Sequence, residues 1–259
     1  MEPTSVPPPA FGSRPARDAR FTVVDRWIDC MNLPDGHPEK HLEFMHRQVN
    51  EELNVLENAA RSLAEFTDAD WSVRMSLARQ CSDEARHAAT YRRVLEERGG
   101  SIGQYPVMNF QYRILSGIDQ LVGRLAVQNR TFEADGLDAA VFGAADAVKR
   151  GDLGLAAVYE AQQADEVQHV KFANDWIRDQ VHKDPRNALR MATALSIAAR
   201  EFASVFTGGG TGVTKYGVDT VARLEAGFAP QEVDLAAAQA EERRRRAVAA
   251  RAVDAPAGG

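Results

Sequence analysis

The chain has 259 residues, of which 44% are hydrophobic and 26% charged, a balance typical of a globular protein with one main domain. Its net charge of −6 argues against dominant nonspecific binding to nucleic acid or to an anionic membrane. The two cysteines, Cys30 and Cys81, are too few for a disulfide framework and wrongly spaced for a zinc site. We therefore expect both to be reduced thiols.

The N-terminal segment, residues 1–15, is rich in proline and is expected to be disordered. It lacks the apolar core of a signal peptide, and no apolar run approaches the roughly 20 residues of a membrane span. These features predict a cytoplasmic protein that makes no membrane contact. A short helix is predicted next, over residues 21–31, and Pro34 stops it.

Two long helices follow, over residues 39–66 and 69–98, and Gly99-Gly100 ends the second. An apolar stripe along the first of them is expected to place Glu52 among apolar neighbours. The stripe consists of Met45, Val49, Leu53, Leu56 and Leu63. A crossover over residues 101–111 must then return the chain to the opposite end of the helix pair.

The third long helix is predicted over residues 112–134, with an interruption at Gly136 and a helical continuation to residue 148. Further helices are predicted over 153–182, 187–206 and 230–253. The segment Gly208–Gly212 with Lys215 lacks P-loop spacing and a preceding strand, so a hinge or lid is favoured over nucleotide binding. The run Arg243–Arg246 is a solvated helix face, an oligomer contact or a basic docking patch.

These elements predict an all-α protein in three parts. Residues 1–15 form the disordered segment, residues 16–185 a helical bundle with an N-terminal helix, and residues 186–259 a C-terminal helical extension. A homodimer is one interpretation of the assembly that the sequence allows.

The motif Asp-Glu-x-x-His occurs twice, at Asp83–His87 and at Asp165–His169, with an offset of 82 residues. Residues three apart lie on one helix face, so each copy directs a carboxylate and an imidazole at a shared point. A single copy of the motif would be interpreted as a solvated charge pair, because such pairs are common by chance.

A glutamate precedes each copy at a matching distance. Glu52 lies 32 residues before Glu84, and Glu133 lies 33 residues before Glu166. The midpoints fall near residues 68 and 150, both in turn sequences, so each glutamate pair is expected at one height of an antiparallel helix pair. We interpret this weak internal repeat as two half-sites that face each other.

The pattern yields four glutamates and two histidines, the ligand set of a carboxylate-bridged dimetal site. The candidate ligands are Glu52, Glu84, His87, Glu133, Glu166 and His169. Glu51 and Glu57 compete with Glu52 for its role. Two divalent cations would neutralise four buried carboxylates, and mixed carboxylate and imidazole ligation suits iron or manganese.

The sequence resembles the ferritin-like diiron carboxylate superfamily over about residues 44–180, and looks closest to a bacterial ferritin-like family of unsettled activity. The resemblance is carried by Asn50–Leu53, Asp83–His87, Thr131–Asp138 and Asp165–Val170. It implies a four-helix bundle with a long crossover between helices two and three. It also implies two Fe²⁺ ions, with manganese or a mixed pair as alternatives, and O₂ as co-substrate.

The resemblance further implies roles for individual residues. Glu52 and Glu133 correspond to terminal carboxylates, and Glu84 and Glu166 to bridging carboxylates. His87 and His169 each correspond to the nitrogen ligand of one metal.

In the surrounding shell, the resemblance makes Asp83 and Asp165 acceptors for the metal-bound histidines, with Arg86 anchoring that network. Gln168 stands where a second arginine is expected, so one half of the shell is arranged differently.

Three further residues are candidates near the metals. Tyr91 and Tyr159 can approach the metals along helix faces. For each of them, a structural role in the core and a redox role are the two interpretations. Gln128, five residues before Glu133, is a polar core or substrate-pocket candidate.

The leading functional hypothesis is an O₂-activating diiron oxygenase or oxidase acting on a small molecule. Hydroxylation, N-oxygenation, desaturation and oxidative cleavage all stay open, and electrons come from an external donor or from the substrate. The alternatives are hydroxylation of a modified tRNA base, a ferroxidase or peroxide-detoxifying activity, and a bundle without catalytic activity.

Overall fold

The computed structural model is predominantly helical, as the sequence predicts. The structure describes residues 11–30, 33–34, 36–205 and 217–253, with the backbone alone for 246–253. Contacts divide the chain into a first unit, residues 1–25 and 29–121, and a second unit, residues 26–28 and 122–259. The domain boundaries predicted at residues 15 and 185 stay a prediction. Residues 208–212 and Lys215, where a hinge or lid was expected, lie outside the described residues.

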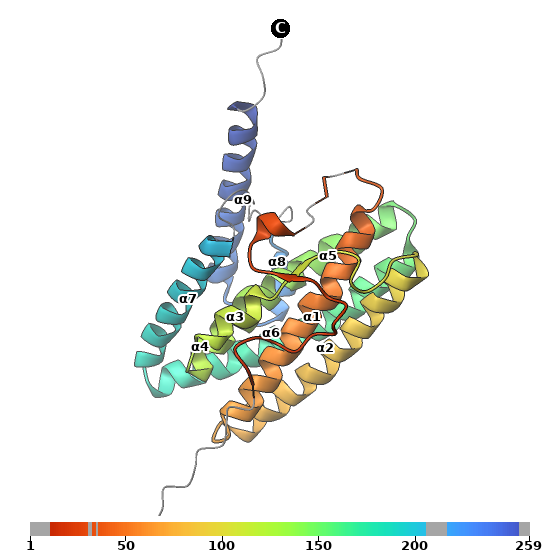
Figure 1. The fold of residues 1–259 in the computed structure, drawn as a ribbon. Helices are drawn as coiled ribbons and strands as arrows, with labels where there is room; N and C mark the ends of the chain where they lie inside the picture. Colours follow the sequence, from red (N-terminus) through yellow and green to blue (C-terminus); the bar gives the residue numbers. More distant parts are fainter. Residues whose placement is uncertain (1–10, 31–32, 35, 206–216, 254–259) are drawn as a thin grey trace, which may run out of the picture. The chain divides into compact units, whose positions relative to one another are not determined.

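The first unit is built on a pair of long helices, α1 (Lys40–Glu65) and α2 (Trp71–Glu97), which lie side by side (Figure 1). Their bounds confirm the predicted ranges to within two residues. The second helix ends as predicted, because Gly99 adopts a φ of 82° and the Gly100 N–H donates to the Leu95 carbonyl at 2.9 Å.

The buried face of α1 is largely polar, which differs from the predicted apolar stripe. Leu53, Leu56 and Leu63 are only half-buried. Every fourth residue on the buried face is instead polar, namely Asn50, Asn54, Asn58 and Ser62. Asn50 Nδ2 donates to the Met108 carbonyl at 2.8 Å. The polar face therefore supplies hydrogen bonds to the segment that follows α2, which contacts α1 through β2 (Val107–Met108) and α3 (Phe110–Ser116).

The helix predicted over residues 21–31 is wrong within the described residues. This stretch contains β1 (Val23–Val24) and the 3₁₀ turn η1 (Trp27–Asp29). β1 pairs in parallel with β2, with Val23 opposite Val107. The two β-branched valines favour an extended backbone, and the partner strand is far away in sequence. A local apolar period could not reveal that pairing.

Gly103 is a position where we expect alanine to be strongly destabilising. Its φ is +93°, and an added Cβ would lie 2.4 Å from the Arg20 carbonyl oxygen. Its N–H also donates to His46 Nε2 at 2.8 Å, which ties this loop to α1. Gly103→Ala should combine the left-handed penalty of roughly 1–2 kcal/mol with an overpacking cost of about 1–3 kcal/mol.

Urea unfolding of Gly103→Ala and Gly99→Ala measures the two costs separately. Gly99 has a similar φ of +82°, but an added Cβ there would meet nothing within 4 Å. Gly99→Ala should therefore lower the free energy of unfolding only by the left-handed penalty of roughly 1–2 kcal/mol. Equal losses in the two variants would contradict the close approach of Arg20.

The second unit begins within a helix that runs from residue 121 to residue 149 without a break. It consists of α4 (Leu121–Val127), the π-helical segment η2 (Gln128–Glu133) and α5 (Ala134–Lys149). The predicted interruption at Gly136 is wrong, because Gly136 does not adopt a positive φ and stays within α5. The break in the predicted third helix instead lies at residues 117–120, where Gly117 ends α3.

The remaining helices are α6 (Leu153–Lys183), α7 (Arg186–Val205), α8 (Thr220–Glu225) and α9 (Pro230–Val253). The ranges of α6, α7 and α9 confirm the predicted helices to within one residue. Asp152 begins α6 by accepting the Leu155 N–H at 3.1 Å. None of the helices in the part of the chain that the structure describes is long and apolar enough to cross a membrane.

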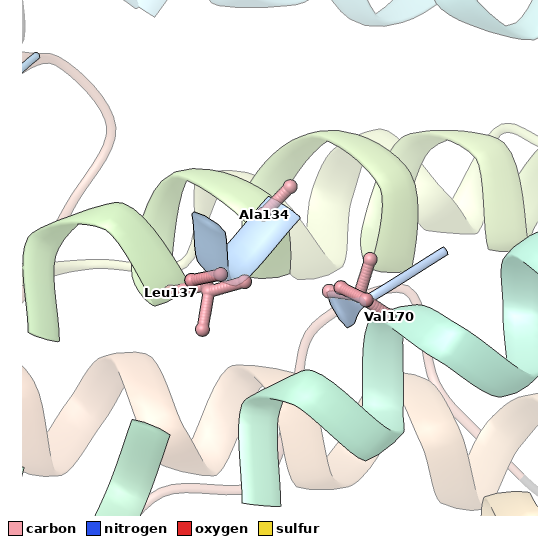
Figure 2. Packing of buried hydrophobic residues seen from close by; sticks show 5 residues of the cluster. Ala134, Leu137 and Val170 are labelled. Atoms are coloured by element: carbon pink, nitrogen blue, oxygen red, sulfur yellow. The ribbon is translucent and has the colours of Figure 1, made fainter. Parts of the chain in front are cut away.

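In the second unit α5 and α6 lie side by side, and α8 packs against both. Figure 2 shows Ala134 and Leu137 of α5 beside Val170 of α6, all fully buried. Ala222 of α8 and Ala226, the residue that follows α8, complete this cluster. The small side chains of Ala134, Ala222 and Ala226 allow α8 to pack closely against α5 and α6.

Candidate metal centre

The first unit holds a buried triad of possible ligands, which we call the first triad: Glu52 of α1 with Glu84 and His87 of α2. His87 Nδ1 lies 3.4 Å from Glu52 Oε2 and 3.1 Å from Glu84 Oε2. One ligand atom from each of the three residues lies within 4.8 Å of the others. The helix pair thus brings Glu52 to the Glu84-x-x-His87 face that the spacing selects.

The second unit holds an equivalent group, the second triad: Glu133 at the end of η2 with Glu166 and His169 of α6. His169 Nδ1 lies 3.4 Å from Glu133 Oε2 and 3.4 Å from Glu166 Oε2. Ligand atoms of these residues also lie within 4.8 Å of one another. All three side chains are buried.

The first triad perturbs the acid–base behaviour of its own members. Burial, together with the Glu84 charge, raises the pKa of Glu52 from 4.5 to about 8, although the hydrogen bond with His87 opposes this. For His87, burial alone would lower the pKa, but the carboxylates of Glu52 and Glu84 outweigh it and raise the pKa to about 11. Without a metal, protons therefore supply the positive charge that the buried carboxylates need.

The stability of the metal-free protein should fall as the pH rises. A group whose folded pKa lies above its unfolded pKa stabilises the fold below the unfolded value and loses that contribution as the pH passes the folded value. For Glu52 this window runs from pH 4.5 to about 8, and His87 adds a loss that continues towards pH 11. Glu52→Gln should have a shallower fall in melting temperature than wild type over the first window.

Metal binding should show the opposite dependence on pH, because the metal displaces these protons. The affinity for Mn²⁺, measured by calorimetry, should rise between about pH 5.5 and pH 8. Binding should release protons to the buffer, because the ligands must deprotonate.

The stability prediction is contradicted if the melting temperatures of wild type and Glu52→Gln fall with the same slope as the pH rises.

The two competitors of Glu52 have cationic partners elsewhere. Glu57 accepts from Arg17 Nη1 at 2.6 Å. Glu51 lies 3.3 Å from Arg47 Nη1 and accepts a hydrogen bond from Gln48 at 3.2 Å. Of the three glutamates, Glu52 is therefore the one that the structure brings into contact with His87.

The outer carboxylates differ in their surroundings. Asp83 is half-buried and pairs with Arg86 at 3.0 Å and with Arg79 at 3.3 Å, while the predicted role of Arg86 in anchoring the histidine network stays a prediction. Asp165 is also half-buried, and Gln168 is exposed. The roles of Asp83 and Asp165 as acceptors for the histidines stay a prediction.

The two tyrosines are buried on the ligand helices. Tyr91 lies one turn after His87 on α2, and Tyr159 lies on α6. The Tyr159 ring packs against Gly143 of α5, where an added Cβ would lie 3.0 Å from the ring. This close approach of α5 to α6 gives Tyr159 a packing role. A redox role for either tyrosine stays a prediction.

Sequence reasoning missed two glutamines beside the triads. Gln80 Nε2 donates to Glu84 Oε1 at 3.4 Å, and Gln162 Nε2 donates to Glu166 Oε1 at 3.3 Å. Both stand four residues before their glutamate, so the repeat extends to Gln-x-x-Asp-Glu-x-x-His. That longer repeat is visible in the sequence and is a more specific signal than Asp-Glu-x-x-His.

The donor chemistry of each triad fits a divalent metal. Two carboxylates and one imidazole are hard or borderline ligands that suit iron and manganese, and no thiolate belongs to either triad. A cation would also compensate carboxylates that are otherwise expensive to bury in ionised form.

The sequence also matches a family described as "Protein of unknown function (DUF455)" over residues 2–234. The chain belongs to this family. The match includes both triads, so the family model spans all six candidate ligands. No curated protein and no solved structure matches the chain.

Proposed function

We propose that the two triads together bind a pair of iron ions in a ferritin-like four-helix bundle, and that the protein is an O₂-activating diiron oxygenase or oxidase. The observation that carries the proposal is the equivalence of the two triads. Each combines a buried glutamate from one helix with a buried Glu-x-x-His from the next helix in the chain. That set of helix positions is characteristic of carboxylate-bridged dimetal proteins.

The protein residues have three tasks in this proposal. The four glutamates supply negative charge that holds the cations, and His87 and His169 supply one nitrogen each. Burial of both triads excludes bulk water, which strengthens the electrostatic attraction between ligands and metal. When bound, the iron pair supplies the electrons that activate O₂ for oxidation of a substrate.

The substrate is proposed to be a small molecule, with electrons delivered by an external donor or by the substrate itself. The proposal of a small substrate follows from the burial of the triads, since a buried centre admits small reactants more readily than macromolecules. Manganese or a mixed pair is the alternative metal content for the same ligand set.

Oxygen consumption tests the proposal. Protein loaded anaerobically with Fe²⁺ is mixed with O₂ while dissolved oxygen and visible absorbance are followed. Wild type should consume O₂ in proportion to bound iron and develop ferric absorption, whereas Glu133→Ala should not. Glu160→Ala is the matched control, because Glu160 is an exposed glutamate on α6 outside both triads.

The same experiment separates the proposal from iron storage. Repeated additions of Fe²⁺ should give oxidation that saturates once the bound iron has reacted. Continued oxidation of added iron, with a large cage by native mass spectrometry, would instead support a ferroxidase. Iron-loaded wild type that does not react with O₂ would contradict the proposal.

A further inference from the structure

Three buried glutamine side chains contact three of the four candidate carboxylate ligands. Gln80 and Gln162 donate to Glu84 and Glu166 as described above, and each reaches forward along its own helix by one turn. In the second triad Gln128 Nε2 also donates to Glu133 Oε1 at 2.9 Å. The glutamines are 0%, 9% and 3% exposed for Gln80, Gln162 and Gln128, so water competes little for these amides.

In each of the three carboxylates, the two oxygens contact different partners. In Glu84, Glu133 and Glu166, Oε1 accepts the glutamine amide. The second oxygen, Oε2, is the one that lies 3.1 to 3.4 Å from the histidine Nδ1 of the same triad. A glutamine amide thus faces one oxygen of each carboxylate, and the other oxygen faces the histidine of the triad.

The π-helical segment explains why the third contact spans five residues instead of four. In an α-helix with 3.6 residues per turn, residues five apart lie on different faces. In a π-helix the hydrogen bonds join residues five apart, so such residues become neighbours on one face. Gln128 and Glu133 are the first and last residues of η2, and the extra residue brings them together.

We propose that Gln80, Gln128 and Gln162 are positioning residues for the metal ligands. Each holds Oε1 of its glutamate and so sets the orientation of the carboxylate that faces the histidine of its triad, and the register of η2 places Gln128 in that role. The proposal rests on the proposed dimetal function and adds the groups that set the ligation mode. Outer residues that orient metal ligands typically change metal affinity by about 10- to 100-fold when they are replaced.

Mn²⁺ binding and infrared spectroscopy of the full-length protein test the proposal. Gln80→Met, Gln128→Met and Gln162→Met keep the side-chain length but remove the amide donor. Gln163→Met is the matched control, because Gln163 is the half-buried neighbour of Gln162 on α6. Calorimetry gives the affinity, and difference spectra of Mn²⁺-loaded against metal-free protein give the separation of the two carboxylate stretching bands.

Each positioning variant should bind Mn²⁺ about 10- to 100-fold more weakly, with the control unchanged. The separation of the carboxylate bands should also change, because a carboxylate that loses its amide donor is free to turn relative to the metal. A role limited to packing would leave the band separation unchanged. Circular dichroism of the metal-free proteins establishes folding, and any one folded variant suffices for the test.

The outcomes distinguish the two proposals. Wild type that binds Mn²⁺, with variants of unchanged affinity and unchanged band separation, would overturn the positioning role and leave the dimetal function standing. Wild type that binds neither Mn²⁺ nor Fe²⁺ would overturn both.

Discussion

His87→Ala and His169→Ala should each remove tight binding of one metal ion from the protein. Each triad contains a single imidazole, and its Nδ1 lies within 3.4 Å of both carboxylates of that triad. Loss of a direct ligand should exceed the effect of outer residues, so we expect an affinity loss of about 100-fold or more for the damaged half. Metal content after anaerobic loading and desalting measures this directly.

Thermal unfolding provides a second readout of the same variants. A ligand that binds only the folded state at about 100 times its Kd stabilises it by about 2.7 kcal/mol. Metal should therefore raise the melting temperature of wild type much more than that of either histidine variant. His41→Ala on α1 and His182→Ala on α6 are the matched controls, because both histidines are exposed. Equal metal content in His87→Ala and His41→Ala would contradict the first triad.

Arg223→Met should cost about 3–5 kcal/mol in the free energy of unfolding, because it leaves a buried carboxylate without its cation. Arg223 of α8 is 7% exposed, and its Nη2 lies 2.6 Å from Oδ2 of Asp138 on α5, which is 4% exposed. Arg223 Nε donates to the same carboxylate at 3.0 Å. Asp138 also accepts the Asp219 N–H at 2.9 Å, so this one pair fixes α8 and its N-terminus against α5.

Urea unfolding of matched variants tests this estimate. Arg92→Met removes an exposed pair, Arg92 to Glu96 at 2.8 Å with side chains 53% and 48% exposed, and should cost no more than about 1 kcal/mol. Combining Arg223→Met with Asp138→Leu should recover much of the loss, because no buried charge then remains. A cost for Arg223→Met no larger than that for Arg92→Met would show that the pair is not buried in solution.

The long helices and the contacts within each triad could be predicted from the sequence, because both follow from the spacing of residues along a helix and from turn residues at its ends. Spacing favoured Glu52 as the partner of the Glu84-x-x-His87 motif while Glu51 and Glu57 stayed competitors, and the structure brings Glu52, Glu84 and His87 together. Turn residues such as Gly99 marked the helix ends for the same local reason.

The features that were missed depend on partners far away in sequence or on irregular helix geometry. β1 forms because it pairs with β2, and the polar face of α1 is buried because the segment after α2 covers it. The contact between Gln128 and Glu133 needs the π-helical register of η2, which an α-helical period conceals. The glutamines four residues before Glu84 and Glu166 were visible, but their meaning depends on burial.

Metal analysis combined with Mössbauer spectroscopy of the anaerobically loaded, then O₂-exposed protein tests the central claim most directly. The four-glutamate, two-histidine ligand set predicts about two irons per chain. After exposure to O₂ they should form a coupled diferric pair without the signal of isolated ferric ions. Fewer than about one iron per chain, or isolated ferric ions in place of a coupled pair, would contradict a dimetal centre assembled from the two triads.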